Sequence, residues 1–324
     1  MAVKWGIIST ADINGKLLAG AAASSDVDVV AVGSRDLDRA RAFADRHGIP
    51  RAYGSYEELL ADPEVEAVYN PLPNTMHVEW SIRALEAGKH VLCEKPLDRD
   101  PAAVERAFDA AERTGMLLTE AFMWRHNPQT RKVLELLAEG AVGELRLVRS
   151  AFSYAKFDVN NIRLRTDMQG GGLMDVGCYC ISGSRTLVGA EPVAVSGHAY
   201  IGPTGTDWVF AGVLRFPGDV LATFDCGTSL ASRDELEAIG TEGALFLDDP
   251  WHCRTPVIEV RRDGVTVDRV ELPFADSYRL ELEDLGRAIR TGGQPLLGRD
   301  DAVGQARVID ALFRSAAEGS VVAV

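Results

Sequence analysis

Short apolar runs alternate with helical patterns over the first third of the chain, and this alternation constrains the fold more than any other feature. Apolar runs typical of buried strands occupy residues 4–8, 27–33, 65–70, 90–93 and 116–119. Helical patterns lie between or beside them, at residues 13–23, 37–46, 56–60, 75–87 and 102–113. Such alternation predicts right-handed βαβ units and a parallel sheet covered on both faces, as in a Rossmann-type α/β domain.

The pattern changes after Ala121, where the apolar runs become longer and alternate with polar residues. Strand-like runs are found at 145–157, 192–201, 208–216, 220–230, 235–241, 244–249, 257–264 and 265–272, and helical patterns at 276–290 and 299–317. We therefore predict a Rossmann domain over residues 1–121 and an α+β domain over 122–324, with a large, mostly antiparallel, open-faced sheet. We expect the uncovered sheet face to be apolar and to be buried in a homodimer or homotetramer.

Composition excludes several classes of partner. Lys and Arg number 34 against 48 Asp and Glu, and a net charge of -14 disfavours nucleic acid and anionic membrane surfaces. No signal peptide is visible, and no run reaches the roughly 20 apolar residues that span a bilayer. The five cysteines are scattered without CxxC spacing, which favours reduced thiols, a cytoplasmic location and no metal site.

The turn after the first strand is a candidate cofactor site. A dinucleotide fold needs small residues here, so that the backbone reaches a pyrophosphate at a helix N-terminus. Serine and alanine replace two glycines of the usual G-x-G-x-x-G pattern, and an ordinary strand-to-helix turn is the alternative. The predicted contacts are Gly6, Ser9, Thr10, Ala11, Asp12 and Ile13.

The end of the second strand indicates which nicotinamide cofactor fits. Ser34 stands where a carboxylate would bind the ribose 2′-hydroxyl of NAD(H), and Arg35 follows it. An arginine favours a 2′-phosphate, so we predict NADP(H) rather than NAD(H). Alternatively, Arg35 is a solvated loop residue, and the direction of the adjacent Asp36 is open.

Two further segments make the chain resemble a known family. The stretch PLPNTMH at 71–77 is followed by ALEAGKHVLCEKP at 84–96, and GGGLMDVGCY occupies 170–179. Together they resemble the glucose–fructose oxidoreductase/inositol dehydrogenase (Gfo/Idh/MocA) family. The resemblance covers essentially the whole chain and implies a pyridine-nucleotide oxidoreductase acting on a sugar, polyol or related carbonyl. It adds Pro71, Asn74, His77, Glu94 and Lys95 to the cofactor site, although His77 is equally suited to capping or packing.

The chemistry of the site is predicted to rest on Lys95, Asp175 and Tyr179. Lys95 follows a buried strand, so it is presented at the carboxyl edge of the sheet, where ligands bind. Asp175 and Tyr179 are four residues apart and share a face if that segment is helical. A tyrosine with a pKa near 10 is a poor base until a nearby cation stabilises its phenolate, and Lys95 is the predicted cation.

Many members of the family carry histidine where this chain has Tyr179. Tyrosine there resembles the branch with D-xylose dehydrogenases and dimeric dihydrodiol dehydrogenases. The sequence departs from the commoner pattern at Arg125 and His126, at the predicted mouth of the substrate pocket. With Tyr154 and Arg163, these are the predicted substrate contacts, although Tyr154 also suits a core and Arg163 a solvated loop.

Two classes of function follow. The first is an NADP(H)-dependent oxidoreductase that oxidises an aldose at C1 like a D-xylose 1-dehydrogenase, or that acts as a dihydrodiol dehydrogenase or keto-sugar reductase. The second is a regulatory protein of the same fold that binds the cofactor without turnover. A regulator has no need of Lys95 and Tyr179, so their presence favours the enzyme.

Overall fold

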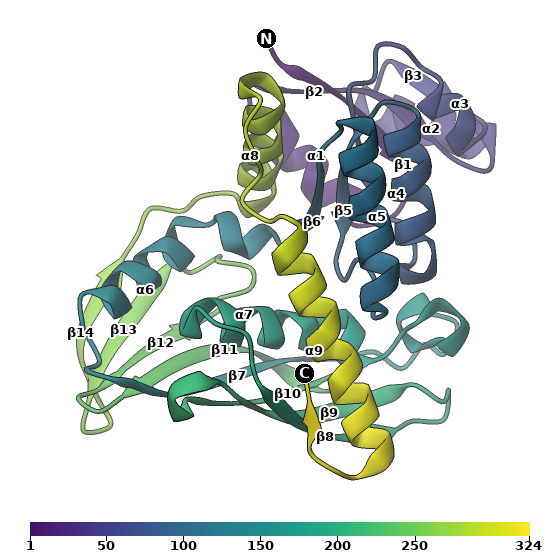
Figure 1. Ribbon diagram of the computed structural model, residues 1–324. Helices are drawn as coiled ribbons and strands as arrows, with labels where there is room; N and C mark the ends of the chain where they lie inside the picture. The colour runs from purple at the N-terminus through teal and green to yellow at the C-terminus, as the bar shows by residue number, and fades with distance from the viewer. The chain divides into compact units, whose positions relative to one another are not determined.

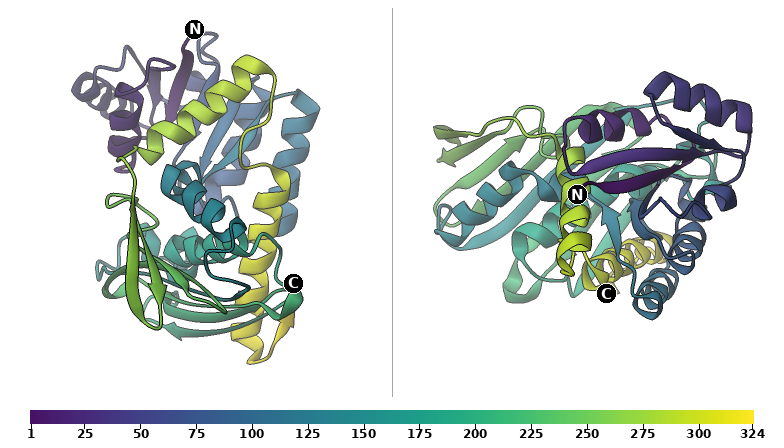
Figure 2. Two further views of the ribbon diagram at one scale, coloured as in Figure 1. Left: turned by 90° about the vertical axis from the view of Figure 1, so that its left-hand side faces the viewer. Right: turned by 90° about the horizontal axis from the view of Figure 1, so that it is seen from above.

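The computed structural model describes residues 1–324, which form two compact units (Figures 1 and 2). Unit 1 consists of residues 1–126 and 276–303, and unit 2 of residues 127–275 and 304–324. The predicted single boundary near residue 121 differs from this division, because helix α8 (Ser277–Thr291) packs on helix α1 (Asn14–Ala22) of the Rossmann unit. Its Leu282 and Leu285 join a buried core with Trp5 and Leu17.

Unit 1 contains a six-stranded parallel sheet in the order β3-β2-β1-β4-β5-β6, as expected for a Rossmann fold. Its strands are β1 (Val3–Ile8), β2 (Val27–Gly33), β3 (Arg51–Tyr53), β4 (Ala67–Asn70), β5 (His90–Glu94) and β6 (Leu118–Ala121). The helices after α1 are α2 (Leu37–His47), α3 (Tyr56–Leu60), α4 (His77–Glu86) and α5 (Pro101–Thr114). Figure 1 shows α4 and α5 packed side by side.

Unit 2 contains a nine-stranded sheet in the order β14-β13-β12-β11-β7-β10-β9-β8-β15. All its neighbouring strands are antiparallel except β7 and β10, which are parallel. The strands are β7 (Leu145–Ala155), β8 (Ala194–Ile201), β9 (Asp207–Arg215), β10 (Leu221–Gly227), β11 (Ser229–Gly240), β12 (Ala244–Asp248), β13 (Val257–Arg262), β14 (Val265–Glu271) and β15 (Val322–Ala323). The fold class predicted from the sequence is confirmed.

One face of the large sheet is covered by helices of the same unit. Helix α7 (Cys178–Val188) packs on β7, β10 and β11, and helix α6 (Pro128–Ala138) packs on α7 and β13. Figure 2 shows the strands of unit 2 as one curved sheet. The last helix, α9 (Arg299–Glu318), runs from unit 1 into unit 2. No helix of the chain is both long and apolar enough to cross a membrane.

The opposite face of this sheet mixes charged and apolar side chains, so the expectation of an apolar open face holds only in part. A hollow of about 580 Å³ on this face is lined by charged side chains, among them Arg149, Arg233, Arg261, Asp225, Glu235 and Glu237. Within it, Arg261 donates to Glu237 over 3.2 Å and Arg233 pairs with Asp225. The strands do alternate as predicted, but their outward positions hold ionic side chains such as Arg149 and Glu237 next to apolar ones such as Val213.

Candidate functional site

The turn between β1 and α1 contains a residue in a left-handed conformation and leads into a helix without a side-chain cap. Ser9 adopts a φ of 85°, a left-handed conformation that normally favours glycine. Its buried Oγ has no hydrogen-bond partner, and no side chain caps the N-terminus of α1. Uncapped amides at a helix start attract anions, so the residues from Ser9 to Ile13 fit a pyrophosphate.

Gly6 has a packing role in this turn. A Cβ at Gly6 would lie 3.1 Å from side-chain atoms of Leu59 and Val65. The first glycine of the motif therefore lets α3 pack against β1, while the approach to a phosphate depends on the residues from Ser9 onward.

At the end of β2, the structure supplies two arginines, and the adjacent carboxylate of Asp36 is engaged by a helix cap. Ser34 is buried, and Asp36 caps α2 by accepting the Asp38 and Arg39 amides over 2.9 and 3.1 Å. This capping answers the open question about the direction of Asp36. The guanidinium groups of Arg35 and Arg39 both face Tyr56; burial raises the pKa of the Tyr56 phenol, and the two positive charges oppose that rise.

Arg39 was not predicted as a candidate cofactor contact, because it lies inside a predicted helix. Its position four residues after Arg35, in the first turn of α2, was the available signal. The pair forms a cationic end to β2, which fits a 2′-phosphate better than an uncharged ribose hydroxyl.

His77 lies inside unit 1 and is 1% exposed. Its Nδ1 is 2.9 Å from the Pro96 carbonyl oxygen, and its Nε2 is 2.6 Å from the Leu72 carbonyl oxygen. Burial, reinforced by the positive charge of Lys95, lowers the pKa of His77 to about 4. These contacts support the alternative in which His77 packs inside the unit. The imidazole connects the loop after β4, which carries Pro71 and Asn74, to Pro96.

Lys95 directly follows β5, and buried polar groups fix the backbone around it. The Tyr69 hydroxyl donates to the Glu94 carboxylate over 2.5 Å, and the Leu97 amide donates to the Glu120 carboxylate over 2.7 Å. The Lys95–Pro96 peptide bond is cis. Glu120, which is 2% exposed, was not predicted to act here. Lys95 is thus held at the carboxyl edge of the sheet, as expected.

Arg125 and His126 are engaged with side chains of their own unit. The Arg125 guanidinium donates to Asp301 over 3.1 Å, and the His126 Nδ1 lies 3.9 Å from the Asp284 carboxylate. Both residues are therefore positioned by the segment 276–303. Their contact with a substrate stays a prediction.

Three predicted residues of unit 2 meet at the Asp175 carboxylate. The Tyr154 hydroxyl donates a short hydrogen bond to Oδ2, and the Arg163 Nε donates to Oδ1 over 3.1 Å. Burial and the Asp175 charge raise the pKa of Tyr154 well above its usual value. Asp175 lies in a π-helical turn (Leu173–Gly177) that continues directly into α7 and Tyr179. The segment is helical as the spacing argument required, but the wider turn was not predicted.

Tyr179 is 6% exposed and lies among aromatic rings that the sequence did not single out as site residues. The ring of Phe152 meets it edge-on at 5.3 Å between centroids, and the Trp251 ring lies 5.9 Å away. Phe152 comes from β7 and Trp251 from the loop after β12. These partners are far apart in sequence, so no local pattern marks them.

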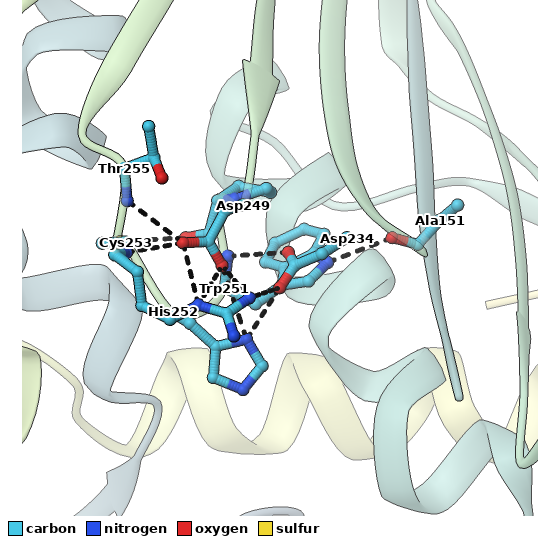
Figure 3. A network of polar contacts seen from close by, with 9 residues as sticks. Ala151, Asp234, Asp249, Trp251, His252, Cys253 and Thr255 are labelled. Carbon is cyan, nitrogen blue, oxygen red and sulfur yellow. Dashed lines mark hydrogen bonds and ion pairs between the residues drawn. The ribbon is translucent and has the colours of Figure 1, made fainter. Parts of the chain in front are cut away.

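A polar network fastens the loop that carries Trp251 (Figure 3). The Asp249 carboxylate accepts from the Arg254 guanidinium and from the amides of Arg254 and Thr255, while Asp234 accepts from the Trp251 amide over 3.2 Å. The His252 Nδ1 lies 2.7 Å from Asp234. Asp234, Asp249 and His252 are close enough to share a metal ion, but donors of the loop itself occupy the two carboxylates.

Comparison with known proteins identifies the chain. A model of an oxidoreductase family with an NAD-binding Rossmann fold matches residues 3–122, and the GFO/IDH/MocA C-terminal domain matches residues 130–246. The chain belongs to the Gfo/Idh/MocA family. It is therefore an oxidoreductase, with an NAD(P)-binding Rossmann domain as its first part.

Several relatives within the Gfo/Idh/MocA family are similar over most of their length. D-xylose 1-dehydrogenase (NADP(+)) 2 of Haloferax volcanii is 37% identical, with 98% of each chain covered. The trans-1,2-dihydrobenzene-1,2-diol dehydrogenase of Mus musculus is 37% identical over 78% of this chain and 76% of its own. Among solved structures, a 3-ketoreductase from Actinomadura kijaniata in complex with NADP and TDP-benzene has a TM-score of 0.91 at 32% identity, covering 97% of this chain and 98% of that one.

Proposed function

We propose that this chain is an NADP(H)-dependent oxidoreductase that transfers a hydride between the nicotinamide and a sugar or related polyol or carbonyl, as a D-xylose 1-dehydrogenase does. The observation that carries the proposal is the convergence of Tyr154 and Arg163 on Asp175, one turn before Tyr179. This is a set of hydrogen-bonding groups suited to hydroxylated substrates. The relative named for NADP(+) and D-xylose supports it.

Each residue has a role in this proposal. The nicotinamide supplies or accepts the hydride. Tyr179 takes the hydroxyl proton during oxidation and returns it during reduction, and Lys95 supplies the positive charge that stabilises its phenolate. Asp175, held by Tyr154 and Arg163, orients the substrate hydroxyls. Ser9 to Ile13 would hold the pyrophosphate, and Pro71, Asn74 and Glu94 would be further contacts of the cofactor.

A screen of nicotinamide absorbance tests the proposal. Aldoses, inositols, dihydrodiols and keto-sugars are each offered with NADP(H) and with NAD(H). Turnover of an aldose with NADP⁺ is the expected result. Turnover of dihydrodiols alone would favour a dihydrodiol dehydrogenase, the alternative that the mouse relative supports. Tight cofactor binding without turnover of any compound would favour a regulatory protein.

We place the enzyme in the cytoplasm, on the ground of its five cysteines without disulfide spacing.

Replacing Arg35 tests the choice of cofactor. We expect Arg35→Ala to raise the KM for NADP(H) by roughly 10- to 100-fold and that for NAD(H) by less than about threefold, because only the 2′-phosphate loses a charged hydrogen bond. Arg39→Ala should have the same sign. Arg41→Ala is the matched control, since Arg41 is an exposed residue of α2 that pairs with Asp38. A wild-type enzyme that prefers NAD(H) tenfold would contradict the assignment.

We also propose that the enzyme forms a homodimer or homotetramer through the open face of the nine-stranded sheet, where charged and apolar side chains are mixed. Arginines and carboxylates alternate on this face, so a second copy related by twofold symmetry presents complementary charges. Light scattering at micromolar concentration should give at least twice the monomer mass. Arg149→Glu should shift the mass toward the monomer, and high salt should do the same. A monomeric wild type would contradict the proposal.

A further inference from the structure

Asp207 is a buried carboxylate of unit 2 that lies against the start of the helix carrying Asp175. It begins β9, is 3% exposed, and accepts the Leu173 amide over 2.6 Å at Oδ2. Hydrogen bonds from the Gly172 amide and from its own amide also stabilise its charge. Leu173 begins the π-helical turn, so this carboxylate caps the combined helical segment from Leu173 to Val188.

The glycine run at 170–172 is shaped around this carboxylate. A Cβ on Gly171, whose φ is +131°, would lie 2.0 Å from the Asp207 Oδ1. Gly171 also donates its amide to the Arg163 carbonyl over 2.8 Å and accepts the Asp175 amide over 3.0 Å. The same turn thus contacts Asp207 on one side and the backbone of Arg163 and Asp175 on the other.

Burial opposes the ionisation of the Asp207 carboxylate, so the presence of an aspartate at this position needs an explanation. Burial raises the pKa of Asp207 to about 7 despite the backbone amides, which act in the opposite direction. The ionisable side chain that faces it, Cys226 on β10, is kept a neutral thiol because burial raises its pKa too. An apolar residue would avoid the desolvation but would leave the Leu173 amide buried without a partner.

We infer that Asp207 is a positioning residue for the proposed reaction: by capping the helical segment at Leu173, it sets where Asp175 and Tyr179 point. The inference deepens the proposed function and rests on it for its kinetic consequence. Asp207 accepts hydrogen bonds from backbone amides at the start of this segment, so it acts through the glycine turn and the two helical turns that follow.

Two substitutions and one control test this inference. We expect Asp207→Ala to lower kcat by about 10²-fold, because small displacements of reacting groups have effects of that size, and to change the KM for NADP(H) by less than about twofold. Asp207→Asn keeps one acceptor oxygen and should recover part of the loss. Asp62→Asn is the matched control: Asp62 is a buried carboxylate that accepts from Arg51 and Tyr53 in the Rossmann unit. It should lower the melting temperature without lowering kcat.

The pH profile distinguishes positioning from a loss of stability. Protonation removes the charged acceptor, so the wild-type kcat should fall as the pH drops through about 7. Asp207→Asn should lack this limb. The inference would be overturned if this limb of the pH profile were unchanged in Asp207→Asn. It would also be overturned if the kcat of Asp207→Ala equalled that of Asp62→Asn.

Hydrogen exchange tests the capping without any substrate. In Asp207→Ala the Leu173 amide should exchange at least about tenfold faster, while amides of α8 keep their rates. Unchanged protection of Leu173 overturns the inference even if kcat falls. A wild type without turnover would count against the proposed function alone, and the exchange rates would then decide whether Asp207 caps this helix.

Discussion

Tyr179→Phe is expected to lower turnover by roughly 10² to 10⁴, with little change in the affinity for NADP(H). The substitution removes the hydroxyl that carries the substrate proton in the proposed reaction. It leaves the ring that packs against Phe152 and Trp251, so the aromatic cluster should persist. Steady-state kinetics for the best substrate of the screen, together with fluorescence titration of NADPH, measures both quantities.

The control for this substitution is Tyr200→Phe, because Tyr200 is 61% exposed on β8. It should keep wild-type turnover. If Tyr179→Phe retained more than about half of the wild-type turnover, with a substrate isotope effect showing that hydride transfer limits the rate, Tyr179 would not be the acid/base. The proton would then pass through Lys95, Asp175 or water.

The parts of the fold that were predictable are those that local periodicity determines. Five of the six strands of the Rossmann sheet and the helices beside them end within a few residues of the predicted positions, whereas the three-residue strand β3 was not predicted. The packing partner of α8 was not predictable, because an amphipathic pattern shows that a helix has a buried face but not which unit buries it. Leu282 and Leu285 pack in the Rossmann core across more than 250 residues of sequence.

The residues of the candidate site also include some that were predictable from the sequence and others that were not. Motif residues such as Asp175 and Lys95 could be found from the sequence because turns and spacing place them at the end of a strand or on a helix. Their supporting groups could not: Glu120 and Asp207 are isolated carboxylates in apolar surroundings, and only the fold shows which amide each accepts. The mixed character of the open sheet face was not predicted, because alternation shows which residues share a face and not which of the two faces the helices cover.

Replacing Lys95 should have the second large effect. We expect Lys95→Ala to lower kcat for oxidation by roughly 10² to 10⁴, as in Tyr179→Phe, because the phenolate loses the cation that stabilises it. Without that charge the hydroxyl of Tyr179 is harder to ionise, so the limb of the pH–rate profile that reports the base should shift to higher pH. The measurement is kcat as a function of pH with saturating cofactor.

Lys95→Arg separates charge from position. It keeps the positive charge, but the planar guanidinium cannot occupy the place of a compact ammonium, so we expect only partial recovery of kcat and an intermediate shift of the limb. Lys4→Ala is the control, since Lys4 is an exposed lysine of the same unit that pairs with Glu64 over 2.9 Å. In the proposed mechanism the two residues act as one unit, so the double variant Lys95→Ala/Tyr179→Phe should be about as slow as either single variant. Losses that multiply in the double variant would show instead that Lys95 contributes independently of the Tyr179 proton transfer.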